Sequence, residues 1–216
     1  LMDKALDAIS EGDEHDAADS SDADEPTRRR GRKIPRYLED LHVDQFFSAI
    51  PLHKTRDRVL FGLMFYCQLR VAEAVSVKAG DVSVTRSTLT VREGKGRKDR
   101  VVAIPPNFLI EIDEYLTEYG FTAADCIITS QKTDGHLKTD AVRKLTRRYS
   151  AIAKIDVPFT ITPHTFRHSG ARWLIDRGVV LTDLQKQLGH ANLETTAIYT
   201  ELTDTKRVDN ILERFR

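Results

Sequence analysis

Apolar residues recur along the chain at helical spacing in several separate segments. Apolar positions three or four residues apart mark one face of a helix, and this pattern predicts helices over residues 41–50, 55–69, 108–119 and 140–154. Thr55 and Asp140 are expected to cap the second and the last of these helices, because short polar side chains accept hydrogen bonds from free helical N–H groups.

A β-hairpin is predicted between the second and third helices. Leu89 and Val91 alternate with polar neighbours, residues 94–99 turn the chain, and residues 100–104 return. The tip of this hairpin is basic. With helices before and after it, the chain is expected to be mainly α with a small antiparallel β-sheet.

Capping signals mark further helices in the last third of the chain. Thr162 is a cap candidate before Pro163, which suits a first helical position, and Gly178 is placed to end that helix. Residues 182–185 have the capping-box pattern, and Gly189 is expected to stop the helix. A short helix after residue 192 and an amphipathic one over residues 208–215 are predicted to follow.

The first 34 residues differ in composition from the rest. Residues 11–25 are acidic and small and lack the apolar surface that would offset the entropy of ordering, and residues 28–33 form a basic cluster. This cluster is either a solvated stretch or an arm that grips phosphates. We expect residues 1–34 to be a linker or tail and residues 35–216 to be the folded domain.

The net charge of zero hides an uneven distribution. Residues 1–26 hold ten acidic residues and one basic residue, so residues 27–216 carry a net charge of +9. This excess favours a polyanionic partner. Two cysteines, Cys67 and Cys126, are too few for a disulfide framework, and the apolar run at residues 59–67 is too short to span a membrane. A cytoplasmic protein without a membrane segment is expected.

The helix predicted from residue 140 has two distinct faces. At about 100° per residue its apolar side chains gather on one side. The opposite side is all positive beyond Asp140: Arg143, Lys144, Arg147 and Arg148. A face that only solvates the helix would normally mix signs, so this one favours contact with nucleic acid.

A second polar group lies at the start of the helix that follows Thr162. His164, Arg167 and His168 share one side, at a helix N-terminus that favours an anion. His164 and His168 also have the spacing of a zinc-binding helix, with His190 as a conceivable third ligand. Arg167 would place a positive charge beside such a cation, so no metal is predicted.

Six residues in order resemble the active-site set of the tyrosine recombinases, the family of phage integrases and Xer-type recombinases. The first two are Arg70, in Leu69-Arg70-Val71-Ala72-Glu73, and Lys95, in Glu93-Gly94-Lys95-Gly96-Arg97-Lys98. The next two, His164 and Arg167, lie in Pro163-His164-Thr165-Phe166-Arg167-His168. The last two are His190, in Leu188-Gly189-His190, and Tyr199, in Thr195-Thr196-Ala197-Ile198-Tyr199-Thr200. The resemblance covers about residues 36–216 and implies the catalytic-domain fold of that family.

The resemblance also implies a role for each residue. Arg70 and Arg167 would bind the phosphate oxygens of DNA, because guanidinium groups stabilise the charge that builds there. His164 would accept the proton of Tyr199, the nucleophile, whose ordinary pKa of about 10 makes it unreactive at neutral pH. Lys95 would protonate the departing 5′ oxygen, and His190 would donate to the phosphate. No cofactor or metal is implied.

Other residues take supporting roles under the same resemblance. Glu73 either holds the site around Arg70 or is an ordinary helix-surface residue, and His168 is expected to support the site. Arg97 and Lys98 are expected to contact DNA, and Lys98 is also a rival to Lys95. Gln68 stands where the family usually has glycine before Leu-Arg, which puts the turn that leads to Arg70 in question.

The family generally carries a separate core-binding domain that closes around DNA. Residues 1–34 are too few and too acidic to form one, so we expect weak DNA binding with little sequence selectivity from this chain alone. The helix at residues 208–215 either packs on its own domain or docks on a neighbouring protomer. The second alternative would couple catalysis to a homotetramer on paired sites in double-stranded DNA.

Three functions compete at this point. The leading hypothesis is a site-specific recombinase or integrase that cleaves and rejoins DNA through a 3′-phosphotyrosine at Tyr199. A type IB topoisomerase would share that chemistry without exchanging partners. A DNA-binding module that has lost catalysis is the third alternative, and a cleavage assay separates it from both enzymes.

Overall fold

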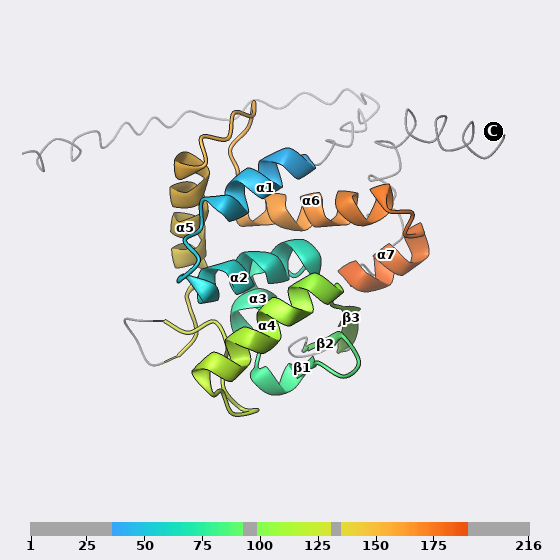
Figure 1. Ribbon diagram of the computed structural model, residues 1–216. Helices are drawn as coiled ribbons and strands as arrows, with labels where there is room; N and C mark the ends of the chain where they lie inside the picture. The colour runs from blue at the N-terminus through green and yellow to red at the C-terminus, as the bar shows by residue number, and fades with distance from the viewer. Residues whose placement is uncertain (1–35, 93–98, 131–134, 190–216) are drawn as a thin grey trace, which may run out of the picture. The chain divides into compact units, whose positions relative to one another are not determined.

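The computed structural model describes residues 36–92, 99–130 and 135–189 (Figure 1). These residues form helices and a small sheet, as the sequence predicts. In chain order the elements are α1 (Asp40–Ser48), α2 (Thr55–Tyr66), α3 (Val71–Ser76), the 3₁₀ turn η1 (Ala79–Asp81), β1 (Val82–Ser83), β2 (Thr88–Val91), β3 (Arg100–Ala103), α4 (Pro106–Tyr119), α5 (Thr139–Ile152), α6 (Pro163–Asp176) and α7 (Leu181–Leu188).

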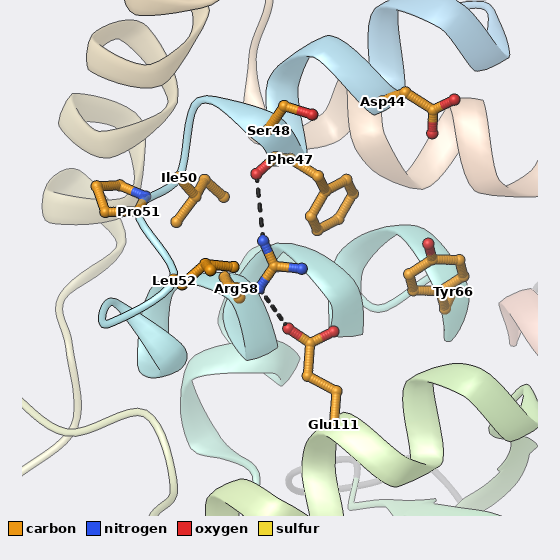
Figure 2. Close-up of a pocket in the computed structure, with 9 residues that line it drawn as sticks. All are labelled: Asp44, Phe47, Ser48, Ile50, Pro51, Leu52, Arg58, Tyr66 and Glu111. Carbon is orange, nitrogen blue, oxygen red and sulfur yellow. Dashed lines mark hydrogen bonds and ion pairs between the residues drawn. The ribbon is translucent and has the colours of Figure 1, made fainter.

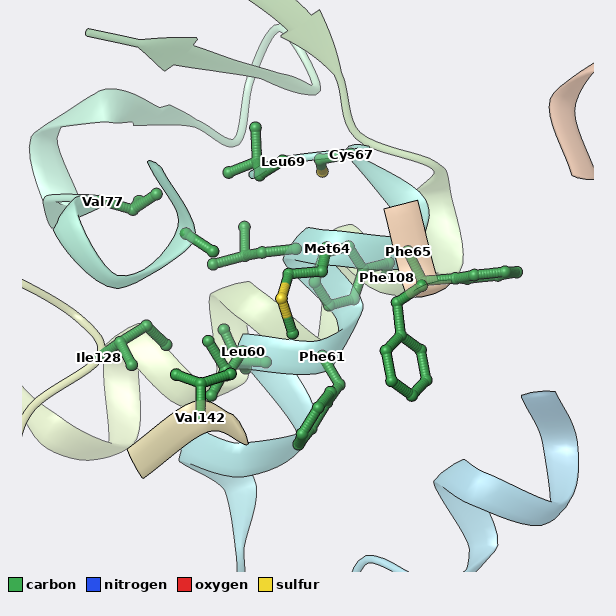
Figure 3. Close-up of a cluster of buried hydrophobic side chains, with 14 of the residues drawn as sticks. Leu60, Phe61, Met64, Phe65, Cys67, Leu69, Val77, Phe108, Ile128 and Val142 are labelled. Atoms are coloured by element: carbon green, nitrogen blue, oxygen red, sulfur yellow. The ribbon is translucent and has the colours of Figure 1, made fainter. Parts of the chain in front are cut away.

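Helix α2 is the centre of the fold. It is buried at every residue from Val59 to Phe65, so this part of it has no solvated face of the kind that most helices show. Figure 1 shows it between α6 and α4, and Figure 3 shows Leu60, Phe61, Met64 and Phe65 within the surrounding apolar cluster. The core therefore forms around α2, and the helices that carry the predicted site pack against it.

Four aromatic rings join α1, α2, α5 and α6. The Phe46 ring centroid lies 4.7 Å from that of Phe61 and 4.4 Å from that of Phe166. Tyr149 packs edge-on against Phe46 and Phe61, and its hydroxyl donates to a carboxylate oxygen of the buried Asp57 over 2.7 Å. Since Phe166 precedes Arg167, this cluster fixes the first half of α6.

The sheet is antiparallel, with strand order β1-β2-β3. Leu89 pairs with Val102 and Val91 with Arg100, and the three apolar side chains are buried. The predicted hairpin is thus confirmed, while its tip at residues 93–98 lies outside the described residues.

Three residues predicted as caps are instead the first or second residue of the helix itself. Thr55 is the first residue of α2, Asp140 the second of α5 and Thr182 the second of α7, so none of them is a cap. The residues that do precede these helices, Lys54, Lys138 and Val180, make no side-chain capping bond. Side-chain capping bonds therefore do not mark these three helix starts.

Other boundaries agree with the prediction. Thr162 precedes α6, Pro163 is its first residue, and Gly178 and Gly189 have the positive φ angles of 83° and 65° that follow helix ends.

Helix α2 ends at Tyr66, three residues earlier than expected, and α3 was not predicted. Ile152 is on the side of α5 where the apolar residues are predicted to gather, but it is 53% exposed, whereas Val142 and Tyr149 on that side are buried. In the described ranges, no helix has the length and apolar character needed to cross a membrane.

Candidate active site

The turn between α2 and α3 places Arg70. Gln68 adopts a positive φ of 50°, which glycine accepts most readily but longer residues adopt at a cost. Its side-chain Nε2 donates to the carbonyl oxygens of Phe65 and Tyr66 over 2.7 and 2.9 Å. These bonds satisfy carbonyls at the end of α2 and hold the turn. The turn therefore forms without the family's usual glycine.

Arg70 sits at the N-cap position of α3, and Glu73 binds it twice. The Glu73 carboxylate accepts the backbone N–H of Arg70 over 2.8 Å and an Nη1 hydrogen over 2.8 Å. Both bonds are local, so the Arg-x-x-Glu sequence itself helps to orient the first arginine. The Glu73 side chain is 11% exposed and is therefore not an ordinary helix-surface residue.

Arg167 approaches the same carboxylate from α6. Its guanidinium is buried, with Nη1 and Nη2 each donating over 2.6 Å to the carbonyl oxygens of Gln68 and Leu188. Nη1 also lies 3.7 Å from Glu73 Oε2. The structure thus brings together two predicted phosphate-binding arginines that lie far apart in the sequence.

Close packing between α6 and α2 makes this approach possible. A Cβ atom on Gly170 would lie 1.9 Å from the carbonyl oxygen of Phe65, so only glycine fits there without a shift. Ser169 Oγ accepts the backbone N–H of Leu38 over 2.8 Å, which ties the segment before α1 to the same helix. Helix α6 is therefore held on both sides near Arg167.

A third arginine, Arg100 on β3, joins Glu73 and was not singled out from the sequence. Its Nη1 and Nη2 donate to the two carboxylate oxygens over 3.0 and 2.8 Å. Burial alone would raise the pKa of Glu73, but hydrogen bonds from Arg100 and Arg70 outweigh it and hold that pKa at about 2. The group is ionised at neutral pH, and arginines surround it.

The two histidines of α6 differ in environment. His164, in the first turn, is exposed, whereas His168 is half-buried. Burial, followed by the electrostatic effects of Arg167 and His164, lowers the pKa of His168 to about 4. His168 is therefore neutral at pH 7, and its predicted supporting role would be that of a polar group rather than of a cation.

Part of the predicted site lies outside the described residues: Lys95, Arg97, Lys98, His190 and Tyr199. Their roles stay predictions. The basic residues of α5, Arg143, Lys144, Arg147 and Arg148, are all exposed, and Arg143 forms an ion pair with Asp140. In the described ranges, no three His, Cys, Asp or Glu side chains gather as a metal site would need.

A surface pocket of about 500 Å³ lies apart from these residues (Figure 2). Arg58 donates to a carboxylate oxygen of Glu111 over 2.7 Å and to the carbonyl oxygen of Phe47 over 3.3 Å. The lining of this pocket includes none of the predicted site residues. The partly buried pair of Arg58 and Glu111 in the pocket is therefore separate from the candidate site.

Comparison with known proteins agrees with the fold. The model of the Phage integrase family matches residues 36–206. The chain belongs to this family, and the resemblance stated from its motifs is confirmed.

Named relatives and solved structures point the same way. The chain is 37% identical to the tyrosine recombinase XerA of Thermococcus kodakarensis and 36% identical to that of Pyrococcus furiosus, over 83% and 88% of its length. It resembles a crystal structure of XerA recombinase with a TM-score of 0.72 at 26% identity, over 84% of this chain and 65% of that one. It also resembles the structure of XerH site-specific recombinase bound to palindromic difH substrate, with a TM-score of 0.71 at 25% identity, over 85% of this chain and 54% of that one.

The matches cover only part of the relatives. The chain spans 64% of the Thermococcus protein and 67% of the Pyrococcus protein. The fold of the described residues is thus that of this family, while the activity of the whole protein is a matter for proposal.

Proposed function

We propose that this chain is the catalytic domain of a site-specific recombinase, which cleaves and rejoins DNA through a phosphotyrosine at Tyr199. The observation that supports this most strongly is the convergence of Arg70 and Arg167 on Glu73, at 2.8 and 3.7 Å. Two guanidinium groups held side by side suit a phosphodiester, whose non-bridging oxygens gain charge during attack.

The reaction divides among the predicted residues in two steps. The Tyr199 oxygen attacks the scissile phosphorus while His164 takes its proton, and the bond from phosphorus to the 5′ oxygen breaks. Lys95 gives a proton to that 5′ oxygen. A 3′-phosphotyrosyl bond remains, and a 5′ hydroxyl from another strand attacks it to rejoin the DNA. Because the covalent bond preserves the energy of the phosphodiester, no ATP is required.

Double-stranded DNA is the proposed partner, and a homotetramer on paired sites is the proposed assembly. The XerH relative is described as bound to its difH substrate, which supports the first part. The net charge of +9 over residues 27–216 and the exposed basic face of α5 also favour a polyanion. Residues 35–216 are proposed to form the catalytic domain and residues 1–34 a linker.

A covalent-trapping experiment tests the proposal. The protein and a Tyr199→Phe variant are each incubated with a nicked suicide DNA substrate. This substrate carries a candidate recombination sequence taken from the DNA beside the protein's own gene. A covalent complex on a denaturing gel is expected with the native protein only, because phenylalanine has no nucleophilic oxygen. Failure of the native protein to form a complex on DNA that it binds would contradict the proposal and favour a DNA-binding module without catalysis.

A further inference from the structure

Arg100, on β3, contacts two other elements of the fold, α3 and α7. It begins β3, where it shares a face with the buried Val102, because alternate strand residues point to the same side. Its side chain is only 10% exposed. Besides the bidentate pair with Glu73 of α3, its Nε donates to the carbonyl oxygen of Gln187, near the end of α7, over 3.3 Å.

The end of α7 is fitted closely to this arginine. A Cβ atom on Gly189 would lie 2.8 Å from Arg100 Cδ, so the glycine allows the backbone to pass beside the guanidinium. The Gln187 side chain pairs with the backbone of Ala103, where Oε1 accepts the N–H over 3.1 Å and Nε2 donates to the carbonyl over 3.3 Å. Arg100 is thus fixed from both β3 and α7.

Charge explains what this fixed arginine does. Glu73 is one carboxylate that faces three guanidinium groups, and two of them, Arg70 and Arg167, are the proposed phosphate ligands. Both carboxylate oxygens accept hydrogen bonds from Arg100. Within the described part of the chain, Arg70 and Arg167 are the guanidinium groups that would still face Glu73 without Arg100, in a partly buried setting where ion pairs are strong.

We propose that Arg100 is a positioning residue that neutralises Glu73 and so keeps the charge of Arg70 and Arg167 available to the scissile phosphate. This inference rests on the proposed function. All three guanidinium nitrogens of Arg100 donate to protein oxygens, so it acts through Glu73 rather than by touching DNA.

A double-mutant cycle tests this role with the full chain. Arg100→Met is made alone and together with Glu73→Gln, and the rate of covalent complex formation on the suicide substrate is measured. Arg100→Met alone is expected to slow cleavage about 10- to 100-fold, with DNA affinity within about 3-fold of the native protein. In the Glu73→Gln background the same change is expected to have an effect of less than about 3-fold, because the charge to be neutralised is gone.

Two further variants separate positioning from stability. Arg58→Met removes a partly buried arginine–glutamate pair away from the site and is expected to leave the cleavage rate unchanged. Arg100→Lys keeps the charge but loses the bidentate geometry, so it should restore part of the lost rate. If Arg100→Met unfolds at the assay temperature, Arg100→Lys takes its place in the cycle, with an expected loss of about 3- to 10-fold that Glu73→Gln removes.

Equal slowing by Arg100→Met in both backgrounds would overturn the proposal, as would an unchanged rate or a loss confined to DNA binding. A measurement that needs no DNA distinguishes failure of this positioning role from failure of the proposed recombinase activity. The NMR signals of the Arg70 and Arg167 side-chain Nε–H groups should shift in Arg100→Met and stay unchanged in Arg58→Met. Unshifted signals would refute the positioning role, whereas a native protein that forms no covalent complex would refute the recombinase activity.

Discussion

Arg167 donates through Nη1 to the backbone carbonyl oxygen of Gln68 over 2.6 Å, in the interior of the protein. The carbonyl belongs to the turn that leads to Arg70, so the second arginine of the site is fixed by the turn that positions the first. A buried guanidinium is costly unless its donors are paired, and a buried carbonyl likewise needs a partner. The two arginines therefore depend on one another through the backbone.

The conformation of Gln68 gives a first prediction. Gln68→Ala keeps the unfavourable φ and loses the bonds to Phe65 and Tyr66, whereas Gln68→Gly loses the same bonds but accepts that φ. Both variants should be less stable than the native protein, and the glycine variant should be more stable than the alanine variant by about 1 kcal/mol. Urea unfolding measures the difference, and an alanine variant as stable as the glycine one would show that the turn is not strained.

The contact between α6 and α2 gives a second prediction. Glycine to alanine inside a helix normally stabilises a protein by about 1 kcal/mol. At Gly170 we expect the opposite, a loss of about 2–3 kcal/mol, because the new methyl group would meet the carbonyl oxygen of Phe65 at 1.9 Å. Thermal or urea unfolding decides the sign. A stabilised variant would mean that α6 can move away from α2 at little cost.

The sequence predicted the parts of the site that depend on local signals. Thr162 and Pro163 start α6 and Gly178 follows its end, so local signals in the sequence fix the positions of His164 and Arg167 on that helix. The Arg-x-x-Glu capping of α3 is local too, yet the helix itself has only six residues, too few to show a periodic pattern.

The parts that were missed depend on contacts between distant segments. Nothing near Gln68 in the sequence shows that its carbonyl oxygen accepts a hydrogen bond from Arg167 on another helix. The sequence does contain one indication that Arg100 is buried with a partner. It lies two residues before the buried Val102, on the core side of the returning strand. A charged residue at a core-facing strand position needs a partner, but only the fold identifies that partner as Glu73.

The lowered pKa of His168 predicts how stability depends on pH. Its pKa is about 4 in the folded protein and 6.5 ordinarily, so between these values the unfolded chain binds more protons. Stability should therefore fall by about 2–3 kcal/mol as the pH drops from 6.5 towards 4. The His168→Asn variant should lack this part of the slope in urea titrations, because asparagine does not titrate.

Glu73 contributes in a separate range and serves as an internal check. Its folded pKa of about 2 lies below its ordinary value of 4.5, so its contribution is lost only as the pH falls below about 4.5. A slope between pH 6.5 and 4.5 that persists unchanged in His168→Asn would contradict the assignment to His168.

The exposed face of α5 gives the last prediction. If Arg147 and Arg148 contact DNA phosphates, changing both to glutamine should weaken binding on every sequence tested. It should also reduce the slope of log affinity against log salt by about 2, since each lost phosphate contact removes about 0.9. Lys54→Gln with Lys78→Gln makes the same change in charge at exposed positions outside α5 and is the matched control. Stability should change by less than about 0.5 kcal/mol in either pair, because all four side chains are exposed. An equal reduction in slope for both pairs would show that DNA responds to net charge alone, and α5 would then have no particular place in the interface.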